Sequence, residues 1–360
     1  MNAAPGNAGT GDASRPGRAA RRRARRPPPP LPQRKGLDAV HWRVPQDAPS
    51  AGAALEMLSR RFPALIDPAA TPLPARFAAG EIVDPDGRAW GAQELLSPGD
   101  ELWFHRELRP EQVPDIELRI LHRDGHLLVL DKPHDMATMP RGMHILASAL
   151  VRLRRETGIE TLVPLHRLDR RTAGVLAFGI RPEERSAYQQ LFARAEVEKE
   201  YEARIIRSVS STLPRRPGES CQLRDHLVKR RGELTSQVLS GVPNAESELE
   251  VIAAATERDG EAAEAGDAEE SGGVLNVLLR PRTGRTHQLR VQLASRGAPI
   301  LGEDLYWPAQ RPRPSEQVWP EGLPLQLLAR RLRFMDPITG AQRDFRSSQA
   351  LGMGSRTLGP

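Results

Sequence analysis

The sequence has little cysteine, few aromatic residues and no long apolar run. Its single cysteine, Cys221, permits neither an intrachain disulfide nor a thiolate zinc cluster. No stretch of eighteen or more apolar residues occurs, so we expect no transmembrane segment. The N-terminus lacks the apolar core of a secretory signal. Together these absences predict a protein of the reducing cytoplasm with no membrane contact.

The excess of positive charge is confined to one end of the chain. The 360 residues carry a formal net charge of +6. Residues 1–36 hold nine Arg and Lys side chains and one Asp, so this segment carries +8 and the remainder −2. A Pro-rich, low-complexity arm of this kind predicts disorder and suits a phosphate backbone. A solvated tail without a partner is an equal alternative.

The residues after the arm, 37–110, predict a small α+β module. Residues 53–62 place apolar side chains at helical spacing, and residues 96–104 have the pattern of a turn followed by a strand. The module has no obvious basic face. Pro110 and Pro114 then mark a linker.

Residues 115–345 carry the patterns of a larger domain. Residues 116–120 alternate and residues 127–130 are apolar, which predicts a hairpin around the Asp124-Gly125 turn. Further elements are expected as helices at about 182–195 and 286–295 and strands at 175–178, 198–205 and 274–280. The pattern weakens between 208 and 273. An acidic stretch near 257–273 predicts an inserted surface loop, and residues 346–360 predict a flexible tail.

One carboxylate lies among basic side chains just before an apolar strand. Residues 165–174 have the sequence LHRLDRRTAG, in which Asp169 is the only acid. Positive charge nearby favours the ionised form of an aspartate. An ordinary surface ion-pair loop is the alternative interpretation.

A second basic stretch follows about 115 residues later. Residues 280–290 have the sequence RPRTGRTHQLR, in which a turn delivers Arg285 to the start of a helix and Arg290 lies farther along it. Guanidinium groups and helix N-termini both suit an anion. The anion is a phosphate or the Asp169 carboxylate, and a helix cap with solvated arginines is the alternative.

These two stretches resemble the RluA family of pseudouridine synthases. Residues 128–133 (LVLDKP) are similar to that family's first motif, and residues 197–203 (VEKEYEA) to its Lys-x-Tyr strand. Residues 297–306 match its closing segment. The motifs occur in the family's order over residues 115–345, with Ala173 where the family usually has Ser and Gln292 where it often has His.

The resemblance implies an α+β catalytic domain built on a mixed, mostly antiparallel sheet. It implies the isomerisation of uridine to pseudouridine in structured RNA by base flipping, without a cofactor or a metal. Large-subunit ribosomal RNA is the preferred substrate, and transfer RNA remains open. The small module resembles, more faintly, an RNA-binding domain shared with some ribosomal proteins. A monomer is expected, although the sequence does not determine the oligomeric state.

The resemblance also assigns catalytic roles. Asp169 would attack the anomeric carbon or remove a ribose proton. Tyr201 would pack against the base and transfer a proton at carbon 5. Arg285 would be the ion-pair partner of Asp169, with Arg290 as the alternative. His287 is interpreted as a structural, hydrogen-bonding residue.

The remaining candidate residues are assigned to substrate binding. Arg167 is expected to fill the gap left by the flipped base. His166, interpreted as a hydrogen-bonding residue, and Thr172 lie beside it in the sequence. Lys132 and Lys199 would contact phosphate, and surface lysines with their stems on apolar surface are the equal alternative.

Two other functions compete with the synthase interpretation. A non-catalytic RNA-binding protein of the same fold would be expected to lack Asp169 or Tyr201, and both are present. A glycosidase normally requires two carboxyl groups that flank one bond, and the Asp169 motif offers one. A metal site is not expected, because the Asp124-Gly125 turn separates His122 from His126.

Overall fold

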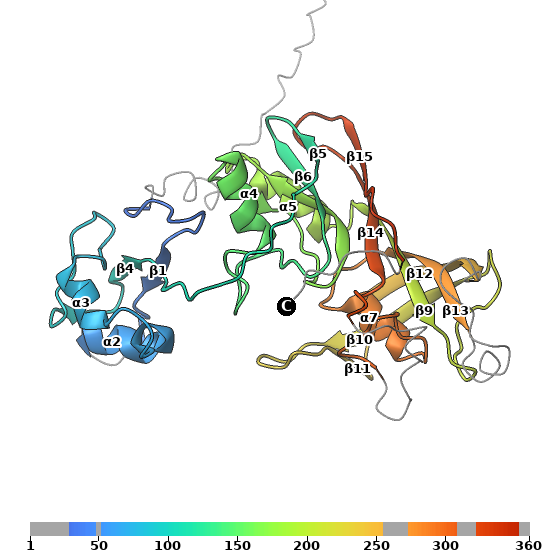
Figure 1. Ribbon diagram of the computed structural model, residues 1–360, viewed down its shortest axis with the longest axis horizontal. Coiled ribbons are helices and arrows are strands. Elements are labelled where there is room, and N and C mark those ends of the chain that lie inside the picture. Colours follow the sequence, from blue (N-terminus) through green and yellow to red (C-terminus); the bar gives the residue numbers. More distant parts are fainter. Residues whose placement is uncertain (1–28, 48–51, 255–272, 308–321, 353–360) are drawn as a thin grey trace, which may run out of the picture. The chain divides into compact units, whose positions relative to one another are not determined.

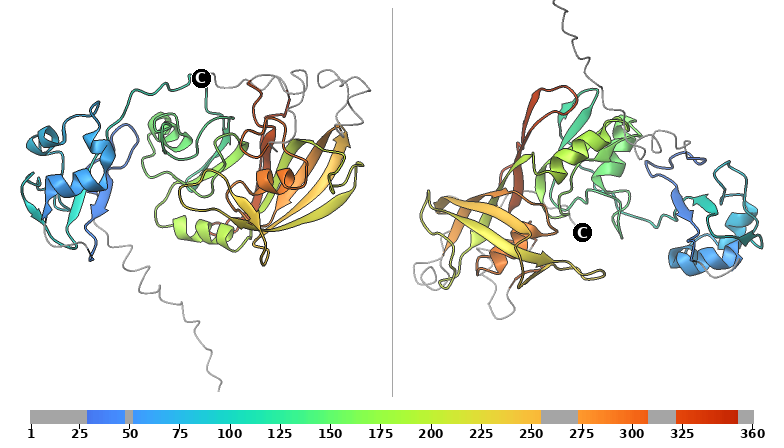
Figure 2. Two further views of the ribbon diagram at one scale, coloured as in Figure 1. Left: turned by 90° about the horizontal axis from the view of Figure 1, so that it is seen from below. Right: turned by 180° about the vertical axis from the view of Figure 1, so that it is seen from behind.

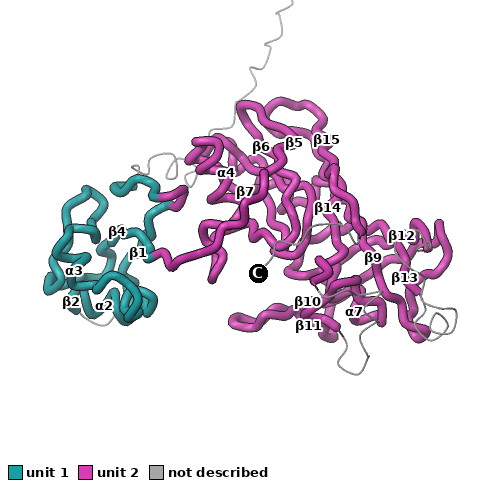
Figure 3. The backbone as a smooth tube through the Cα atoms, in the orientation of Figure 1, with its two compact units in different colours: residues 1–34, 38–107 teal, residues 35–37, 108–360 magenta. Residues whose placement is uncertain are grey.

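The computed structural model describes residues 29–47, 52–254, 273–307 and 322–352 (Figure 1). Most of the predicted basic arm, nearly all of the acidic insertion and the last eight residues lie outside these ranges. The chain divides into two compact units, residues 1–34 with 38–107 and residues 35–37 with 108–360 (Figure 3). No helix in the described ranges is long and apolar enough to cross a membrane.

The first unit is a small α+β module with its own hydrophobic core. It contains β1 (Val40–Arg43) paired with β4 (Glu101–Phe104), β2 (Gly52–Ala53) paired with β3 (Leu95–Leu96), helices α2 (Ala54–Arg61) and α3 (Leu73–Ala78), and the 3-10 helix η1 (Pro63–Ile66). The apolar face of α2 buries Leu58 against Leu102 and Phe104 of β4. The helix and the strand expected from the sequence are both present.

The second unit is built on an eleven-stranded sheet. Its strands are β5 (Ile120–Arg123), β6 (Leu127–Lys132), β7 (Val163–Pro164), β8 (Ala173–Gly179), β9 (Glu198–Ile206), β10 (Ser220–Val228), β11 (Gln237–Leu239), β12 (Ala245–Ala254), β13 (Val274–Pro281), β14 (Leu327–Met335) and β15 (Gln342–Arg346). The main order is β11-β10-β12-β13-β9-β14-β8-β6-β5, with β15 beside β14 and β7 beside β8. Among these described strands only β14 and β8 pair in parallel. The sheet is therefore mixed and mostly antiparallel, which confirms the predicted fold class.

Three helices within the described part of this unit cover the sheet: α4 (Ala149–Thr157), α5 (Arg185–Ala193) and α7 (Gln288–Ala294). Alternate residues of β6 and β8 face α4 and α5, so these helices lie on the two sides of that part of the sheet (Figure 2). Helix α7 packs on β9, β12 and β13 through Leu289 and Leu293. Tyr201 of β9 contacts both the apolar cluster beneath α4 and the apolar cluster beneath α7. It therefore lies at the junction of the two clusters.

The strands β10, β11 and β12 occupy the region where the sequence pattern weakens. The inward side of β12 begins with Ala245 and Ser247, both fully buried. These side chains are small or polar, so they do not give the apolar alternation that marks a strand.

The hairpin expected at 116–130 forms with a shorter first strand. β5 begins at Ile120, which is the last residue of the predicted strand at 116–120. The carbonyl oxygens of Pro114 and Ile116 accept hydrogen bonds from Arg152 of α4. The backbone before β5 is thus paired with a side chain in place of a neighbouring strand.

Gly174 allows β8 and β14 to pair closely. Its φ is +111°, and an added Cβ would lie 2.2 Å from the carbonyl oxygen of Ala329 in β14. Only glycine fits both the conformation and the space. The motif that carries Asp169 therefore ends on a residue required by the sheet.

The C-terminal end of the described chain returns to β6. Asp131, which is 3% exposed, accepts hydrogen bonds from Ser347 Oγ (2.6 Å), from Ser348 N and Oγ (2.9 and 2.8 Å) and from Gln349 Nε2 (2.8 Å). A buried carboxylate needs such donors. The structure corrects the prediction of a flexible tail from residue 346, because residues 347–349 are fixed to the sheet.

Candidate active site

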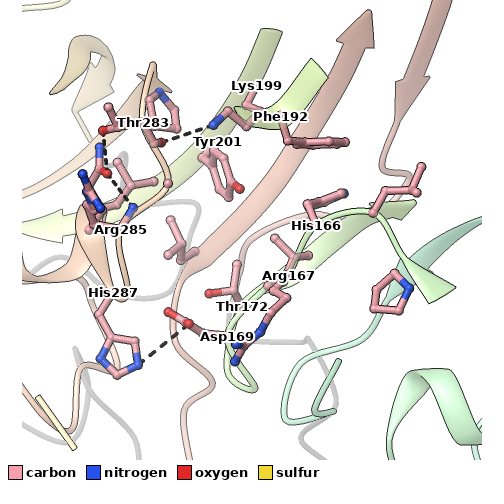
Figure 4. A pocket seen from close by; sticks show the side chains of 18 of the residues that line it. His166, Arg167, Asp169, Thr172, Phe192, Lys199, Tyr201, Thr283, Arg285 and His287 are labelled. Carbon is pink, nitrogen blue, oxygen red and sulfur yellow. Dashed lines mark hydrogen bonds and ion pairs between the residues drawn. The ribbon is translucent and has the colours of Figure 1, made fainter. Parts of the chain in front are cut away.

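A cavity of about 700 Å³ brings together most of the residues singled out from the sequence. Asp169, Tyr201 and Arg285 all line it (Figure 4). The substrate-binding candidates that also line it are Arg167, His166, Lys199, Thr172 and Arg290. Its walls come from the loop between β7 and β8, the start of β9 and the turn before α7. Segments more than 100 residues apart in sequence thus share one cavity.

Hydrogen bonds hold the backbone of the Asp169 loop in place. The carbonyl oxygen of Leu168 accepts a bond from Thr138 Oγ1 (2.8 Å), that of Arg170 from Lys132 Nζ (3.2 Å) and that of Arg171 from His134 Nδ1 (2.9 Å). The carbonyl of Asp169 itself accepts from the Thr172 amide. Four consecutive carbonyls are therefore satisfied, and the Asp169 side chain, 31% exposed, projects into the cavity from a fixed backbone (Figure 4).

Tyr201 projects into the same cavity from β9. Burial raises the pKa of its phenol, and the nearby Asp169 carboxylate raises it further. The phenol therefore keeps its proton at neutral pH. An apolar ring with a hydroxyl donor suits contact with a flat, polar-edged ligand.

Lys199 and His166 form a second, partly buried wall. Lys199 Nζ donates to the carbonyl of Thr283 (3.2 Å), and burial lowers the pKa of this lysine. His166 Nε2 accepts the Ala177 amide (3.2 Å), and its ring stacks on Phe192 at 5.0 Å. Burial, with Lys199 nearby, lowers the pKa of His166 to about 3, so the ring is neutral.

Comparison with known proteins shows which enzymes the chain resembles. A sequence model described as RNA pseudouridylate synthase matches residues 126–295, which include the Asp169, Tyr201 and Arg290 segments. An RNA pseudouridine synthase of Synechocystis is 28% identical over 243 residues, which cover 66% of this chain and 74% of the relative. The dual-specificity RNA pseudouridine synthase RluA of Escherichia coli is 28% identical over 192 residues (52% and 77%). The tRNA pseudouridine synthase C of Vibrio cholerae is 29% identical over 229 residues (62% and 87%).

Over residues 126–295 the chain is similar to the RluA-type RNA pseudouridine synthases. It is accordingly an isomerase that acts on RNA. Among solved structures, human RNA pseudouridylate synthase domain containing 1 superposes with a TM-score of 0.47 at 21% identity, covering 66% of this chain and 85% of that one.

The structure corrects the prediction that Arg285 pairs with Asp169 in this synthase. Arg285 Nε donates to the carbonyl of Asn244 (3.1 Å), and its amide donates to Gln288 Oε1 (3.0 Å). No ion pair between Arg285 and Asp169 occurs in the described ranges. The turn before α7 directs this guanidinium along the cavity wall and away from the carboxylate.

Arg290, the alternative named from the sequence, is buried beneath the cavity. Its Nε and Nη2 donate to both oxygens of Glu303, and Nη2 also donates to Asp304 (2.8 Å). Burial lowers the pKa of Arg290, but pairing with the fully buried Glu303 outweighs burial and raises it, and Asp169 adds to the rise. Arg290 therefore keeps its positive charge and attracts the Asp169 carboxylate, while its Nε and Nη2 groups already donate to Glu303 and Asp304.

His287 is the residue in contact with Asp169, and the sequence interpretation did not identify this contact. His287 Nε2 lies 3.8 Å from Asp169 Oδ1 (Figure 4). The spacing of the motif placed this histidine in a helix, whereas its φ of +55° puts it just before α7 in a left-handed conformation. No local sequence signal marks that backbone turn.

Lys132 does not lie in the cavity, and both alternatives considered for it are wrong. It is fully buried, and its Nζ donates to the carbonyls of Pro133 and Met136 as well as Arg170. Burial lowers its pKa to about 7. The lysine supports the Asp169 loop from behind and is not placed to contact phosphate.

Arg167 and Thr172 also line the cavity, and their exposure to solvent differs widely. Arg167 is exposed, whereas Thr172 is 3% exposed.

Among the described residues, no three His, Cys, Asp or Glu side chains are grouped as a metal site would require.

Proposed function

We propose that this synthase isomerises specific uridines in large-subunit ribosomal RNA, in the cytoplasm. One observation carries the proposal: a lone, partly exposed carboxylate shares a cavity with a half-buried tyrosine and a set of cationic side chains. The cavity of about 700 Å³ has the volume typical of a small-ligand site, so it accommodates a single flipped nucleotide. Its cations suit the phosphates on either side of that nucleotide.

The proposed reaction breaks the bond between uracil N1 and ribose C1′ and forms one between uracil C5 and C1′. Asp169 either attacks C1′ or removes the proton from C2′, and the lone carboxylate supports both routes. Arg290 and His287 stabilise the negative charge that returns to Asp169 when its bond to the substrate breaks. The proton that leaves C5 goes to water and N1 takes up a proton from water, so uridine and pseudouridine have the same composition.

Tyr201 is proposed to hold the detached uracil. The raised pKa of the phenol opposes its conversion to phenolate beside Asp169. Packing against the base and donating a hydrogen bond to it therefore suit this residue better than accepting the C5 proton. Exposed Arg167 is proposed to stack in the gap that the flipped base leaves.

The Asp169→Asn variant tests the proposal. We expect pseudouridine formation on a large-subunit RNA fragment to fall by about 1,000-fold or more, because the amide neither attacks carbon nor removes a proton at a useful rate. Pseudouridine would be counted by mass spectrometry after nuclease digestion. The matched control is Asp344→Asn, which makes the same charge change at an exposed ion pair on β15 and is expected to leave the rate within about threefold.

The substrate is tested by mapping pseudouridines in cells with and without this protein. Loss of a site in large-subunit RNA, restored by the wild-type chain and not by Asp169→Asn, supports the proposal. Loss confined to transfer RNA would replace ribosomal RNA with transfer RNA as the substrate, in line with the name of the Vibrio relative.

A further inference from the structure

His287 combines three features that its family motif does not explain. It adopts a φ of +55°, a conformation that non-glycine residues rarely take. Its side chain is 15% exposed at the cavity wall. Its two ring nitrogens have different partners, Tyr306 at Nδ1 and Asp169 at Nε2. Backbone strain of this kind persists where the surroundings require it, and it is concentrated at functional sites.

A chain of hydrogen bonds determines which nitrogen of His287 carries the proton. The backbone amide of Ser236 donates to the Tyr306 hydroxyl oxygen (2.8 Å), and that oxygen lies 2.7 Å from His287 Nδ1. An amide can only donate, so it occupies a lone pair of the hydroxyl and leaves the hydroxyl proton for another acceptor. At 2.7 Å, His287 Nδ1 is placed to accept that proton.

The imidazole is therefore neutral, with its proton on Nε2. Burial lowers the pKa of His287, against the opposing effect of Asp169, while Arg290 and Lys229 lower it further. With Nδ1 accepting from Tyr306, the single ring proton lies on Nε2 and points at the Asp169 carboxylate. The fold thus sets both the tautomer and the direction of this N–H group.

We propose that His287 is a positioning residue that fixes the orientation of the Asp169 carboxylate, and that Tyr306 holds it in the required tautomer. The inference rests on Asp169 being the catalytic carboxylate. A hydrogen bond from Nε2 to Oδ1 leaves Oδ2 to face the ribose. The distance of 3.8 Å exceeds a hydrogen bond by about 1 Å, and contacts of this kind tighten when substrate fills a site.

The same chain connects Asp169 to the β10–β11 hairpin. Ser236 lies just before β11, is 4% exposed, and its hydroxyl donates to the carbonyl of Thr286 (2.8 Å). The hairpin therefore supports the Tyr306 hydroxyl and the backbone next to His287 together. Displacement of the hairpin would remove the hydrogen bonds that select the His287 tautomer. The Asp169 carboxylate would then lose the donor that orients it.

Two substitutions of His287 separate its two nitrogens. In His287→Gln the side-chain amide reaches the position of Nε2, so a donor to Asp169 is kept. In His287→Asn the shorter amide reaches only the position of Nδ1, so the contact with Tyr306 is kept and the donor to Asp169 is lost. Asparagine is also enriched at positive φ, so this variant relieves backbone strain. Loss of activity in His287→Asn would therefore not come from misfolding.

The measurement is multiple-turnover kinetics on one RNA fragment with the full-length chain. We expect kcat of His287→Asn to fall by about 100-fold with KM within about threefold, since one preorganised donor is lost. For His287→Gln we expect kcat within about tenfold of wild type. Tyr306→Phe removes the hydroxyl proton that selects the tautomer, and we expect an intermediate fall in kcat.

Several outcomes would overturn the inference. Wild-type kcat in His287→Asn would do so, as would equal losses in the Asn and Gln variants, or a change confined to KM. An Asp169→Asn variant as active as wild type would instead overturn the proposed function, and the role of His287 with it. An inactive Asp169→Asn beside an unimpaired His287→Asn overturns the His287 inference alone.

Discussion

At the scale of single residues, the site depends on buried polar groups whose charge state the fold determines. His166 is held neutral on the cavity wall, because its Nε2 must accept the Ala177 amide and because burial disfavours the imidazolium. Protonation would remove that acceptor and place a charge against Phe192. Acid should therefore weaken the fold at the cavity before it affects the distant parts of the sheet.

The pH dependence of stability tests this. The pKa of His166 falls from 6.5 in the unfolded chain to about 3 in the folded one, so the unfolded chain binds more protons between these values. The stabilisation is complete above pH 6.5 and is lost as the pH falls towards 3. We expect the wild type to lose about 2 kcal/mol more unfolding free energy between pH 7 and pH 5 than His166→Gln, whose amide oxygen keeps the acceptor. Equal losses in urea titrations of the two proteins would contradict this.

At the scale of elements, the central sheet depends on the contact of β8 with β14. A side chain at Gly174 would meet the Ala329 carbonyl, and both strands are committed on their other edges, β8 to β6 and β14 to β9. Neither strand can shift to make room without breaking a second pairing. The loop that carries Asp169 enters β8 at Ala173, one residue before Gly174.

Gly174→Ala is therefore expected to destabilise the protein by more than about 3 kcal/mol, since it combines a forbidden φ with a backbone clash. The matched control is Gly218→Ala. Gly218 has a φ of +86° but no atom within 4 Å of an added Cβ, so we expect a cost of only about 1 kcal/mol. Urea-induced unfolding followed by circular dichroism measures both. Similar costs for the two variants would show that φ alone, and not the approach of β14, sets the requirement for glycine.

The sequence predicts those strands and helices whose apolar pattern lies within the element itself. Strands β6, β8, β9 and β13 were predictable from apolar runs or alternation. The resemblance carried by the motifs assigned catalytic roles to Asp169 and Tyr201, which the structure places in one cavity. Strand β12 was missed because Ala245 and Ser247 supply the first two of its inward positions. The pairing of β14 with both β9 and β8 has no local signal, since it joins segments more than 100 residues apart.

In the candidate site too, contacts between segments far apart in sequence could not be predicted from local patterns. The residues around Arg285 predict a cationic turn, and its direction depends on the backbone at His287, whose positive φ leaves no mark in the sequence. Lys132 was predicted at the surface because lysine is rarely buried. Its burial requires three carbonyls from two separate segments, which only the folded chain brings together.

At the scale of the whole molecule, each unit has a hydrophobic core of its own. In the second unit, residues 347–349 form hydrogen bonds to strand β6. Residues 347–349 supply the hydrogen bonds that keep Asp131 of β6 satisfied. These partners are more than 210 residues apart in sequence. The buried carboxylate thus makes the stability of β6 depend on the C-terminal segment.

Truncation after Arg346 tests this dependence. We expect a loss of about 3 kcal/mol in unfolding free energy, because the Asp131 carboxylate would remain buried without its donors. Adding Asp131→Asn to the truncated chain removes the buried charge and should recover part of the loss. Thermal unfolding by circular dichroism compares the two truncated proteins with the full chain. A truncated protein as stable as the full chain, or no recovery with asparagine, would show that Asp131 is not the cause.

The parallel contact of β8 with β14 also has a consequence for synthesis of the chain on the ribosome. Ala173 and its partner Leu328 are 155 residues apart, so at about 5–20 residues per second roughly 10–30 s pass between their translation. During that interval the nascent strand β8 has β6 as a neighbour but not β14. The first unit is by then fully synthesised and able to fold. The loop that carries Asp169 is therefore fixed by the complete sheet only after β14 has been translated.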